Sequence, residues 1–357
     1  MTASPASPLI DVHTHPTLSS WEQAYDALDL PRVDGRPTQE NIRLPEWSPT
    51  MFLDAMRLHG IQAMVMSWPP GTSIVRGTAA RDLARAMNEE MAGYIRRYPA
   101  RFGGFAVVPT DDMGAAAEEA VYATEVLGLE GICLPTNIDG LYLGEDRFAE
   151  LFAECDRRRI TVFVHPVTPR FFADIPLPYG PSVMEYMFET TRMLTSLVYS
   201  GRRSQYPNFP LIATHAGGVM PFISWRLATT ANFLGVGGGK KMDPEEVWVG
   251  LKSFHFDLTT APAAPSLASI LQLVPATQLM MGTDCPTRPQ PNITMALDEL
   301  ASSSLVNSEQ RRQIRAGTAM RLFPRLAAAV DNELRRDGNA RASKADPVPA
   351  SPMESHR

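Results

Sequence analysis

The chain has few cysteines, no block of one charge and no long apolar run, and each absence removes a class of protein. Its three cysteines form no Cys-x-x-Cys pair, which excludes a disulfide scaffold and suits a reducing compartment. No segment reaches the roughly 18 apolar residues of a membrane-spanning helix. The first eight residues (MTASPASP) lack the basic and apolar parts of a signal peptide. We therefore expect a cytoplasmic protein with no membrane partner.

The charge is mildly acidic and spread along the chain. There are 33 Lys and Arg against 39 Asp and Glu, a formal net charge of −6, and the only short basic run is at 157–159. Nucleic acid is therefore not an expected partner. A length of 357 residues with 44% hydrophobic residues is enough for one large α/β barrel or two ordinary domains.

Eight short apolar or β-branched runs recur, each followed by a loop and a segment with helical periodicity. The runs are 9–13 (LIDVH), 63–68 (AMVMSW), 105–109 (FAVVP), 131–135 (GICLP), 161–165 (TVFVH), 211–215 (LIATH), 254–258 (FHFDL) and 279–284 (LMMGTD). This alternation predicts a parallel sheet with crossover helices, and eight strand–helix repeats close a (β/α)₈ TIM barrel. An open doubly wound sheet is the alternative. We expect a leader at 1–8, a barrel domain at 9–330, and a helix end with a disordered tail at 331–357.

Capping signals predict several of the helices. Ser48 and Pro49 are typical of a helix N-terminus, and Gly60 of its end. Further helices are predicted at 79–98 and 110–127. The connections at 16–47 and 166–184, after the first and fifth strands, are too long for simple turns, so we expect long loops there that act as lids or bind a ligand.

Four histidines and one aspartate fall at predicted strand ends: His13 and His15 around the first strand, His165 and His215 after the fifth and sixth, and Asp284 after the eighth. The carboxyl ends of barrel strands open onto one face, so these side chains are expected to converge. A His-x-His pair points both imidazoles to one side of a strand. With a third imidazole and a carboxylate it makes a ligand set for Zn²⁺, with Mn²⁺ or Fe²⁺ as alternatives.

One further carboxylate is a candidate partner for this site. Asp257, two residues after His255 in the seventh run, can point into the barrel mouth and accept a hydrogen bond from a ligand histidine.

Four motifs carry a resemblance to a known family: 11–15 (DVHTH), 164–166 (VHP), 214–218 (THAGG) and 282–286 (GTDCP). The chain, from about residue 9 to 326, resembles the amidohydrolase superfamily. Within it, the chain is most similar to metal-dependent non-oxidative decarboxylases of the aminocarboxymuconate-semialdehyde and 6-methylsalicylate type. The resemblance implies an amidohydrolase-type barrel. It also implies the metal ligands His13, His15, His165 and Asp284, with His215 as catalytic acid or base. In this scheme Asp284 is an alternative proton donor.

The match has one informative departure. Two-metal members of the superfamily carry a bridging Lys or Glu at the end of the fourth strand, where this chain runs GICLPTN at 131–137. A single metal ion per chain is therefore expected, with Zn²⁺ first and Mn²⁺ as the alternative, and no organic cofactor.

The resemblance also assigns two substrate-binding arginines. Arg43 and Arg226 occupy positions at which relatives bind the substrate carboxylate, for which the arginine fork is suited. Arg226 is expected to reach across a homodimer interface, supported by an apolar stripe of Met220, Phe222, Ile223 and Leu227. We therefore expect loss of CO₂ from a small hydroxyaryl or enoic acid. A mononuclear hydrolase of lactones or amides and a non-catalytic barrel remain alternatives.

Overall fold

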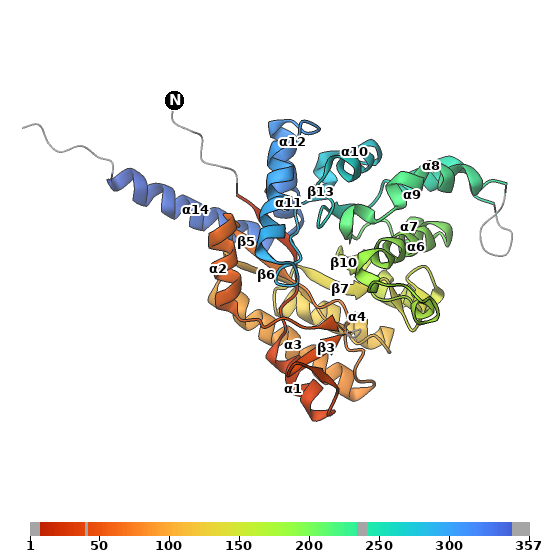
Figure 1. Ribbon diagram of the computed structural model, residues 1–357, viewed down its shortest axis with the longest axis horizontal. Coiled ribbons are helices and arrows are strands. Elements are labelled where there is room, and N and C mark those ends of the chain that lie inside the picture. Colours follow the sequence, from red (N-terminus) through yellow and green to blue (C-terminus); the bar gives the residue numbers. More distant parts are fainter. Residues whose placement is uncertain (1–7, 40–41, 234–240, 345–357) are drawn as a thin grey trace, which may run out of the picture.

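The computed structural model describes residues 8–39, 42–233 and 241–344, and its centre is a parallel sheet of eight strands. In sheet order the strands are β1 (Ile10–Thr14), β5 (Ala63–Met66), β6 (Phe102–Ala106), β7 (Gly131–Pro135), β10 (Thr161–His165), β11 (Leu211–Ala213), β12 (His255–Asp257) and β13 (Leu279–Met280). Bridges from Asp11 to Met281 and from Thr14 to Cys285 join the last strand to the first. The sheet therefore closes into a barrel with helices outside it (Figure 1), which confirms the predicted (β/α)₈ fold and excludes an open sheet.

The helices pack around this barrel and continue beyond it. They are α1 (Ser19–Ala27), α2 (Pro49–His59), α3 (Thr78–Arg97), α4 (Met113–Val121), α5 (Ala149–Arg158), α6 (Glu185–Tyr199), α7 (Arg202–Gln205), α8 (Met220–Thr230), α9 (Pro244–Leu251), α10 (Ala264–Leu273), α11 (Gln290–Ser302), α12 (Ser308–Arg312), α13 (Thr318–Leu322) and α14 (Pro324–Lys344). Short strands β2 (Arg32–Val33), β3 (Arg36–Gln39) and β4 (Ile42–Arg43) form one small antiparallel sheet, and β8 (Asn137–Ile138) with β9 (Leu141–Tyr142) forms another.

All eight predicted runs become barrel strands, with one clear shift. β6 begins at Phe102, three residues before the predicted run at 105–109. A Cβ on Gly103 would lie 2.8 Å from the Glu130 carboxylate, so the glycine allows the strand and this side chain to approach closely.

The predicted helix caps are confirmed where they were strongest. The Ser48 side chain accepts a hydrogen bond from the Met51 amide at 3.3 Å, and Gly60 ends α2 in the left-handed conformation at φ 65°. The helix predicted at 110–127 starts at Met113, because the Asp112 side chain caps it, and continues as a π-turn at Tyr122–Val126.

The two long connections differ from each other. The first contains α1 and the β2–β4 sheet, so this long loop has secondary structure of its own. Leu18, Trp21 and Tyr25 are buried at helical spacing, and this apolar stripe holds α1 against the barrel. The second connection has only two 3₁₀ turns, Arg170–Asp174 and Pro181–Val183, before α6.

A column of aromatic rings fills the barrel beneath its carboxyl end. The ring of His13 lies 5.4 Å from that of Phe163, which stacks on Phe105 at 4.8 Å, and Phe105 contacts Phe323 at 5.6 Å. These rings belong to a core of buried strand residues and residues from the C-terminal helices. The strand ends therefore stand on a packed apolar floor.

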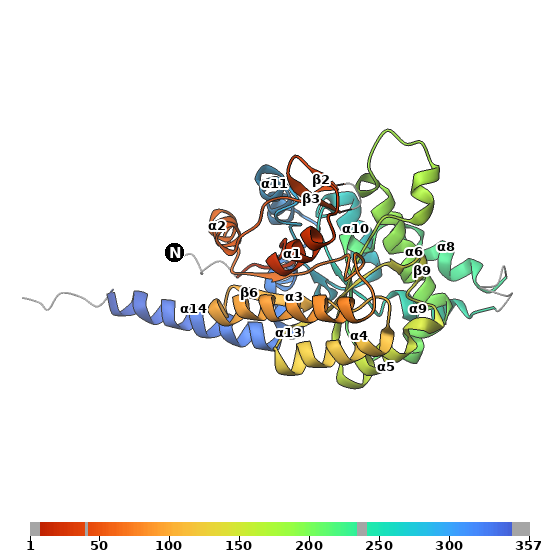
Figure 2. The same cartoon turned by 90° about the horizontal axis from the view of Figure 1, so that it is seen from below.

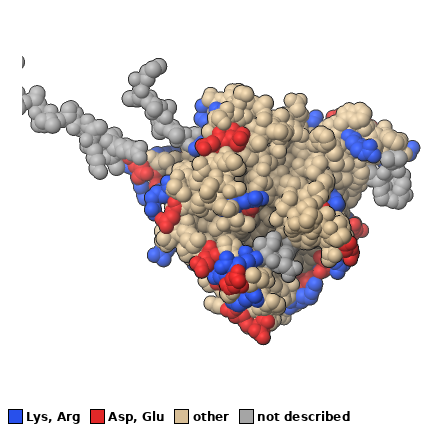
Figure 3. All heavy atoms as spheres, viewed as in Figure 1, with Lys and Arg blue, Asp and Glu red and all other residues tan. Residues whose placement is uncertain are grey.

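The C-terminal helix is longer than expected. α14 runs out past the barrel to Lys344, into the segment predicted as a tail, whereas residues 345–357 and leader residues 1–7 lie outside the described residues (Figure 2). Basic and acidic side chains are interspersed on the face shown in Figure 3. No helix in the described ranges is both long and apolar enough to cross a membrane.

Candidate active site

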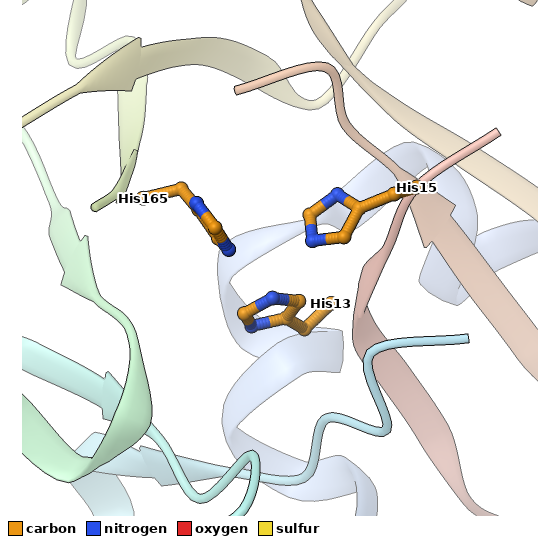
Figure 4. Close-up of side chains that lie close together, drawn as sticks. All are labelled: His13, His15 and His165. Atoms are coloured by element: carbon orange, nitrogen blue, oxygen red, sulfur yellow. The ribbon is translucent and has the colours of Figure 1, made fainter. Parts of the chain in front are cut away.

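Three imidazoles meet at the carboxyl end of the barrel. His13 and His15 come from β1 and its end, and His165 from the last residue of β10; Figure 4 shows the three rings turned toward one another. One ring nitrogen from each of these residues lies within 4.8 Å of the others. The period of two along β1 and the convergence of parallel strand ends produce this grouping.

Each of the three rings is held by a hydrogen bond on its outer nitrogen. Nδ1 of His13 lies 2.9 Å from Oδ2 of Asp257, Nδ1 of His15 lies 3.3 Å from the Ser67 carbonyl, and Nδ1 of His165 lies 2.7 Å from the Pro166 carbonyl. The hydrogen bond predicted for Asp257 is thereby confirmed. Such outer contacts fix the ring so that Nε2 faces inward, as in metal-ligating histidines.

The inward-facing nitrogens fit a divalent metal ion. Among the described residues, the Nε2 atoms of His13 and His15 are buried and have no hydrogen-bond partner. A buried polar atom without a partner is costly unless a ligand satisfies it. Neutral imidazole nitrogens with a nearby carboxylate are a ligand set for Zn²⁺ or Mn²⁺.

Asp284 adds that carboxylate from the loop after β13. Its Oδ1 lies 3.4 Å from Nε2 of His15 and 4.0 Å from Nε2 of His13, while its Oδ2 faces Nε of Arg288 at 3.3 Å. Burial raises the pKa of Asp284, although the nearby His13 and Arg288 oppose the shift.

His215 stands beside this group at the end of β11. Its ring lies 5.1 Å from that of His13 and 5.5 Å from that of His165, and its main-chain amide donates to Oδ1 of Asp257 at 3.0 Å. Nδ1 of His215 is buried without a partner among the described residues. Burial, together with the charge on His13, lowers its pKa to about 3, so the ring is neutral at pH 7 and able to accept a proton.

Three successive barrel strands are each followed, within four residues, by a residue in the left-handed backbone conformation. His215, Thr260 and Asp284 have φ of 56°, 57° and 64° and follow β11, β12 and β13. This conformation costs about 1–3 kcal/mol for a residue other than glycine and gathers at functional sites. The turns place all three residues on the wall of one cavity.

Burial shapes the charges of the histidine group. It pushes the pKa values of His15 and His165 well below their usual range, and the neighbouring histidines add to the effect. Burial is the largest single effect on His13 and acts in the same direction, but the carboxylates of Asp257, Asp284 and Asp11 together outweigh it and raise the pKa of His13. Asp11, which accepts from the Thr283 hydroxyl at 2.5 Å, has its pKa raised to about 7 by burial.

A cavity of about 290 Å³ opens beside the histidines. Its walls are His15, Thr17, Leu44, Pro45, Trp68, Pro69, His165, Ser182, Tyr186, Met187, His215, Thr260, Asp284, Thr287, Arg288 and Pro289. Both long connections contribute to this wall, the first through Leu44 and the second through Ser182. The volume accommodates one substituted aromatic ring.

The two arginines assigned to the substrate are not brought to this cavity within one chain. Arg43 is exposed on β4, although Leu44 beside it lines the cavity. Arg226 is exposed on the outer face of α8. The arginine that does line the cavity is Arg288, which no sequence motif singled out.

The end of β7 carries no second metal ligand. Asn137, two residues after this strand, donates its side-chain amide to Oε2 of Glu189 at 2.8 Å. In the described part of the chain, His13, His15 and His165 form the one cluster of three or more ligand groups.

Comparison with known proteins places these features in context. A family model described as Amidohydrolase matches residues 10–325. Decarboxylase yanB of Aspergillus niger is 30% identical over 345 residues, covering 92% of this chain and 91% of that protein. The 6-methylsalicylic acid decarboxylase of Penicillium expansum is 30% identical over 327 residues, covering 90% of this chain and 98% of that one.

A solved structure shows the same fold. The 5-carboxyvanillate decarboxylase of Novosphingobium aromaticivorans, crystallised with manganese and 4-hydroxy-3-methoxy-5-nitrobenzoic acid, superposes with a TM-score of 0.77. The match has 19% identity and covers 89% of this chain and 96% of that chain.

Proposed function

We propose, from the premise that this chain belongs to the amidohydrolase family, that it releases CO₂ from a small hydroxyaryl carboxylic acid. The chain is a metal-dependent decarboxylase, a carboxy-lyase. The observation that carries this function is its similarity, over about nine tenths of its length, to relatives named as decarboxylases. The histidine group in the barrel mouth supplies the site that such a reaction needs.

The proposed metal ligands are His13, His15, His165 and Asp284, holding one ion per chain. Zn²⁺ is the proposed ion and Mn²⁺ the alternative, because imidazole and carboxylate suit both. A divalent ion there supplies a Lewis acid and a template for the acidic substrate, without an organic cofactor. Elemental analysis of the purified protein tests the stoichiometry, since two ions per chain would contradict it.

The residues of the chain move the proton. Loss of CO₂ from an aryl carboxylate breaks the bond between the ring and the carboxyl carbon, and the electron pair returns to the ring, which gains one proton at that carbon. Asp284 delivers this proton directly, or the neutral His215 first takes up a proton and passes it to the ring carbon, because both residues stand on the cavity wall beside the histidine group. The enclosing wall of Trp68, Tyr186 and Met187 restricts water around the reacting ring.

A second copy of the chain completes the proposed assembly. Of the predicted stripe on α8, Met220 is buried, Ile223 and Leu227 are half-buried, and Phe222 is 82% exposed. Trp225, outside that stripe, is 69% exposed beside Arg226. Aromatic residues at i and i+3 form an apolar surface that suits a partner subunit. We propose that Arg226 of one subunit and Arg43, the neighbour of the lining residue Leu44, bind the substrate carboxylate in a homodimer.

A hydrolase of lactones or amides is the competing function, since the same site can activate water. Incubating the metal-loaded protein with hydroxybenzoates and with aryl lactones separates the two. CO₂ release from a hydroxybenzoate supports the proposal. Ring opening of a lactone with no CO₂ from any acid would replace it.

A further inference from the structure

Arg288 is the permanent cation on the wall of the active-site cavity. Among the described residues that line this cavity, no other is an arginine or lysine. Arg288 lies in the short segment between β13 and α11, four residues after Asp284. A single chain therefore already carries a positive group at the place where an acidic substrate would bind.

Most of the guanidinium is free to bind a ligand. Its Nε donates to Oδ2 of Asp284 at 3.3 Å, and its two terminal nitrogens have no hydrogen-bond partner among the described residues. The side chain is 39% exposed and lines both this cavity and a neighbouring one next to Thr283 and Asn292, so part of it is open to solvent. An arginine presents a planar fork of donors that matches a carboxylate in two parallel hydrogen bonds.

The groups around Arg288 favour binding of an anion in addition to its salt bridge with Asp284. Asp284 is the one carboxylate on the described cavity wall, and its other oxygen faces His15 at 3.4 Å. The positive charge of Arg288 also acts on His215, whose pKa it helps to lower after the larger effects of burial and His13. Arg288 thus lies on the same cavity wall as Asp284 and His215. A carboxylate entering this partly buried space needs a cation partner to offset its desolvation.

We propose that Arg288 binds the carboxylate of the substrate through its terminal N–H groups and selects aryl acids over neutral aryl compounds. This inference rests on the proposed function for the identity of the ligand as an aryl carboxylate. It differs from the roles assigned to Arg43 and Arg226, because Arg288 lines the cavity of its own subunit and needs no partner.

Paired probes of equal shape test this role. Binding of benzoate and of neutral benzamide to the full-length, metal-loaded protein is measured by calorimetry for the wild type, R288Q and R288K. R288Q should weaken benzoate binding by roughly 10- to 100-fold while benzamide changes by less than about twofold, because a charged hydrogen-bond pair is lost. R288K keeps the charge without the fork and should weaken benzoate binding by a smaller factor.

The control is R76Q. Arg76 also pairs with an aspartate, Asp139 at 2.9 Å, but lines a different cavity, so its loss should leave the benzoate preference unchanged. Metal content is determined on every sample. If R288Q loses its metal, R288K provides the measurement.

Two results would overturn the role of Arg288. The first is equal weakening of benzoate and benzamide in the variants, which would mean that Arg288 acts only by positioning Asp284. The second is a wild-type protein that binds both probes equally. A wild type that prefers benzoate but releases no CO₂ from any acid would instead contradict the proposed function and leave this inference standing.

Discussion

At the scale of single residues, His165 and His215 stand close together yet have different proposed roles. His165 belongs to the cluster of ligand nitrogens, whereas His215 lies beside it with an unpartnered Nδ1. H215A should keep the metal and lose about 10²–10⁴-fold in turnover, the usual contribution of acid–base catalysis. H165A should lose both metal and activity. Elemental analysis with kcat for each variant checks this, and a metal-free H215A would make His215 a ligand.

Asp257 supports two parts of the site at once. It accepts from the His13 ring at 2.9 Å and from the main-chain amides of His215 and Thr259, both at 3.0 Å. D257N removes the charge that orients His13 and should lower metal affinity by roughly 10- to 100-fold. Metal titration in competition with a chelator measures the effect. D54N, at an exposed helical aspartate paired with Arg57, is the control and should not change affinity.

The sequence predicts the histidines and the aspartate of this site better than it predicts the positions of the arginines. His13, His15, His165, His215 and Asp284 could be placed together because strand ends of a barrel share one face. Arg288 could not, because an arginine four residues after an aspartate resembles a local ion pair, and only the fold shows that it lines the cavity. The outward position of Arg226 likewise depends on which face of α8 the barrel covers.

At the scale of elements, Gly218 sets how closely the His215 turn approaches α6. It has φ of 65°, and a Cβ there would lie 2.1 Å from the main-chain oxygen of Met187. G218A should cost at least roughly 1–2 kcal/mol of stability from the left-handed backbone alone and should lower kcat by displacing His215. Thermal unfolding and kinetics measure both effects. G180A, with open space around the added methyl group, is the control; equal behaviour of the two variants would contradict this account.

The outer face of α8 is the proposed dimer surface. W225E introduces a charge where 69% of the Trp225 side chain is exposed and should convert the dimer to a monomer with reduced activity on acids. Light scattering at several protein concentrations measures the mass. V126E is the control. Val126 is an apolar residue, 67% exposed, at the end of the π-turn after α4 and away from α8 in the sequence, so this variant should leave the mass unchanged. A wild type that is monomeric and fully active would exclude the role of Arg226 across the interface.

Elements were predictable where local signals agreed with packing. Ser48 and Gly60 correctly predicted the two ends of α2, because capping residues act within one helical turn. α1 was missed because its short apolar stripe is held by burial of Trp21 and Tyr25 against the barrel, which is a tertiary contact. The start of β6 was missed because its glycine serves close packing against Glu130.

At the scale of the whole molecule, the residues that form the hydrophobic core are largely different from those that form the candidate active site. The aromatic rings of Phe163, Phe105 and Phe323 and the outer helices form the core, while the site lies at the strand ends and in the turns that follow them. Sequence periodicity predicted this architecture because the repeat of strand and helix is regular. The size of the cavity could not be predicted, because it depends on how both long connections fold over the strand ends.

The isotopic composition of the product tests the central claim, decarboxylation, most directly. The metal-loaded protein is incubated with a hydroxybenzoate that it consumes, in water labelled with both ²H and ¹⁸O, and the organic product is examined by mass spectrometry and NMR. Decarboxylation by proton delivery predicts a single carbon-bound deuterium at the position that carried the carboxylate, and no ¹⁸O. A hydroxybenzoate that is consumed to a product without carbon-bound deuterium at that position would contradict the account.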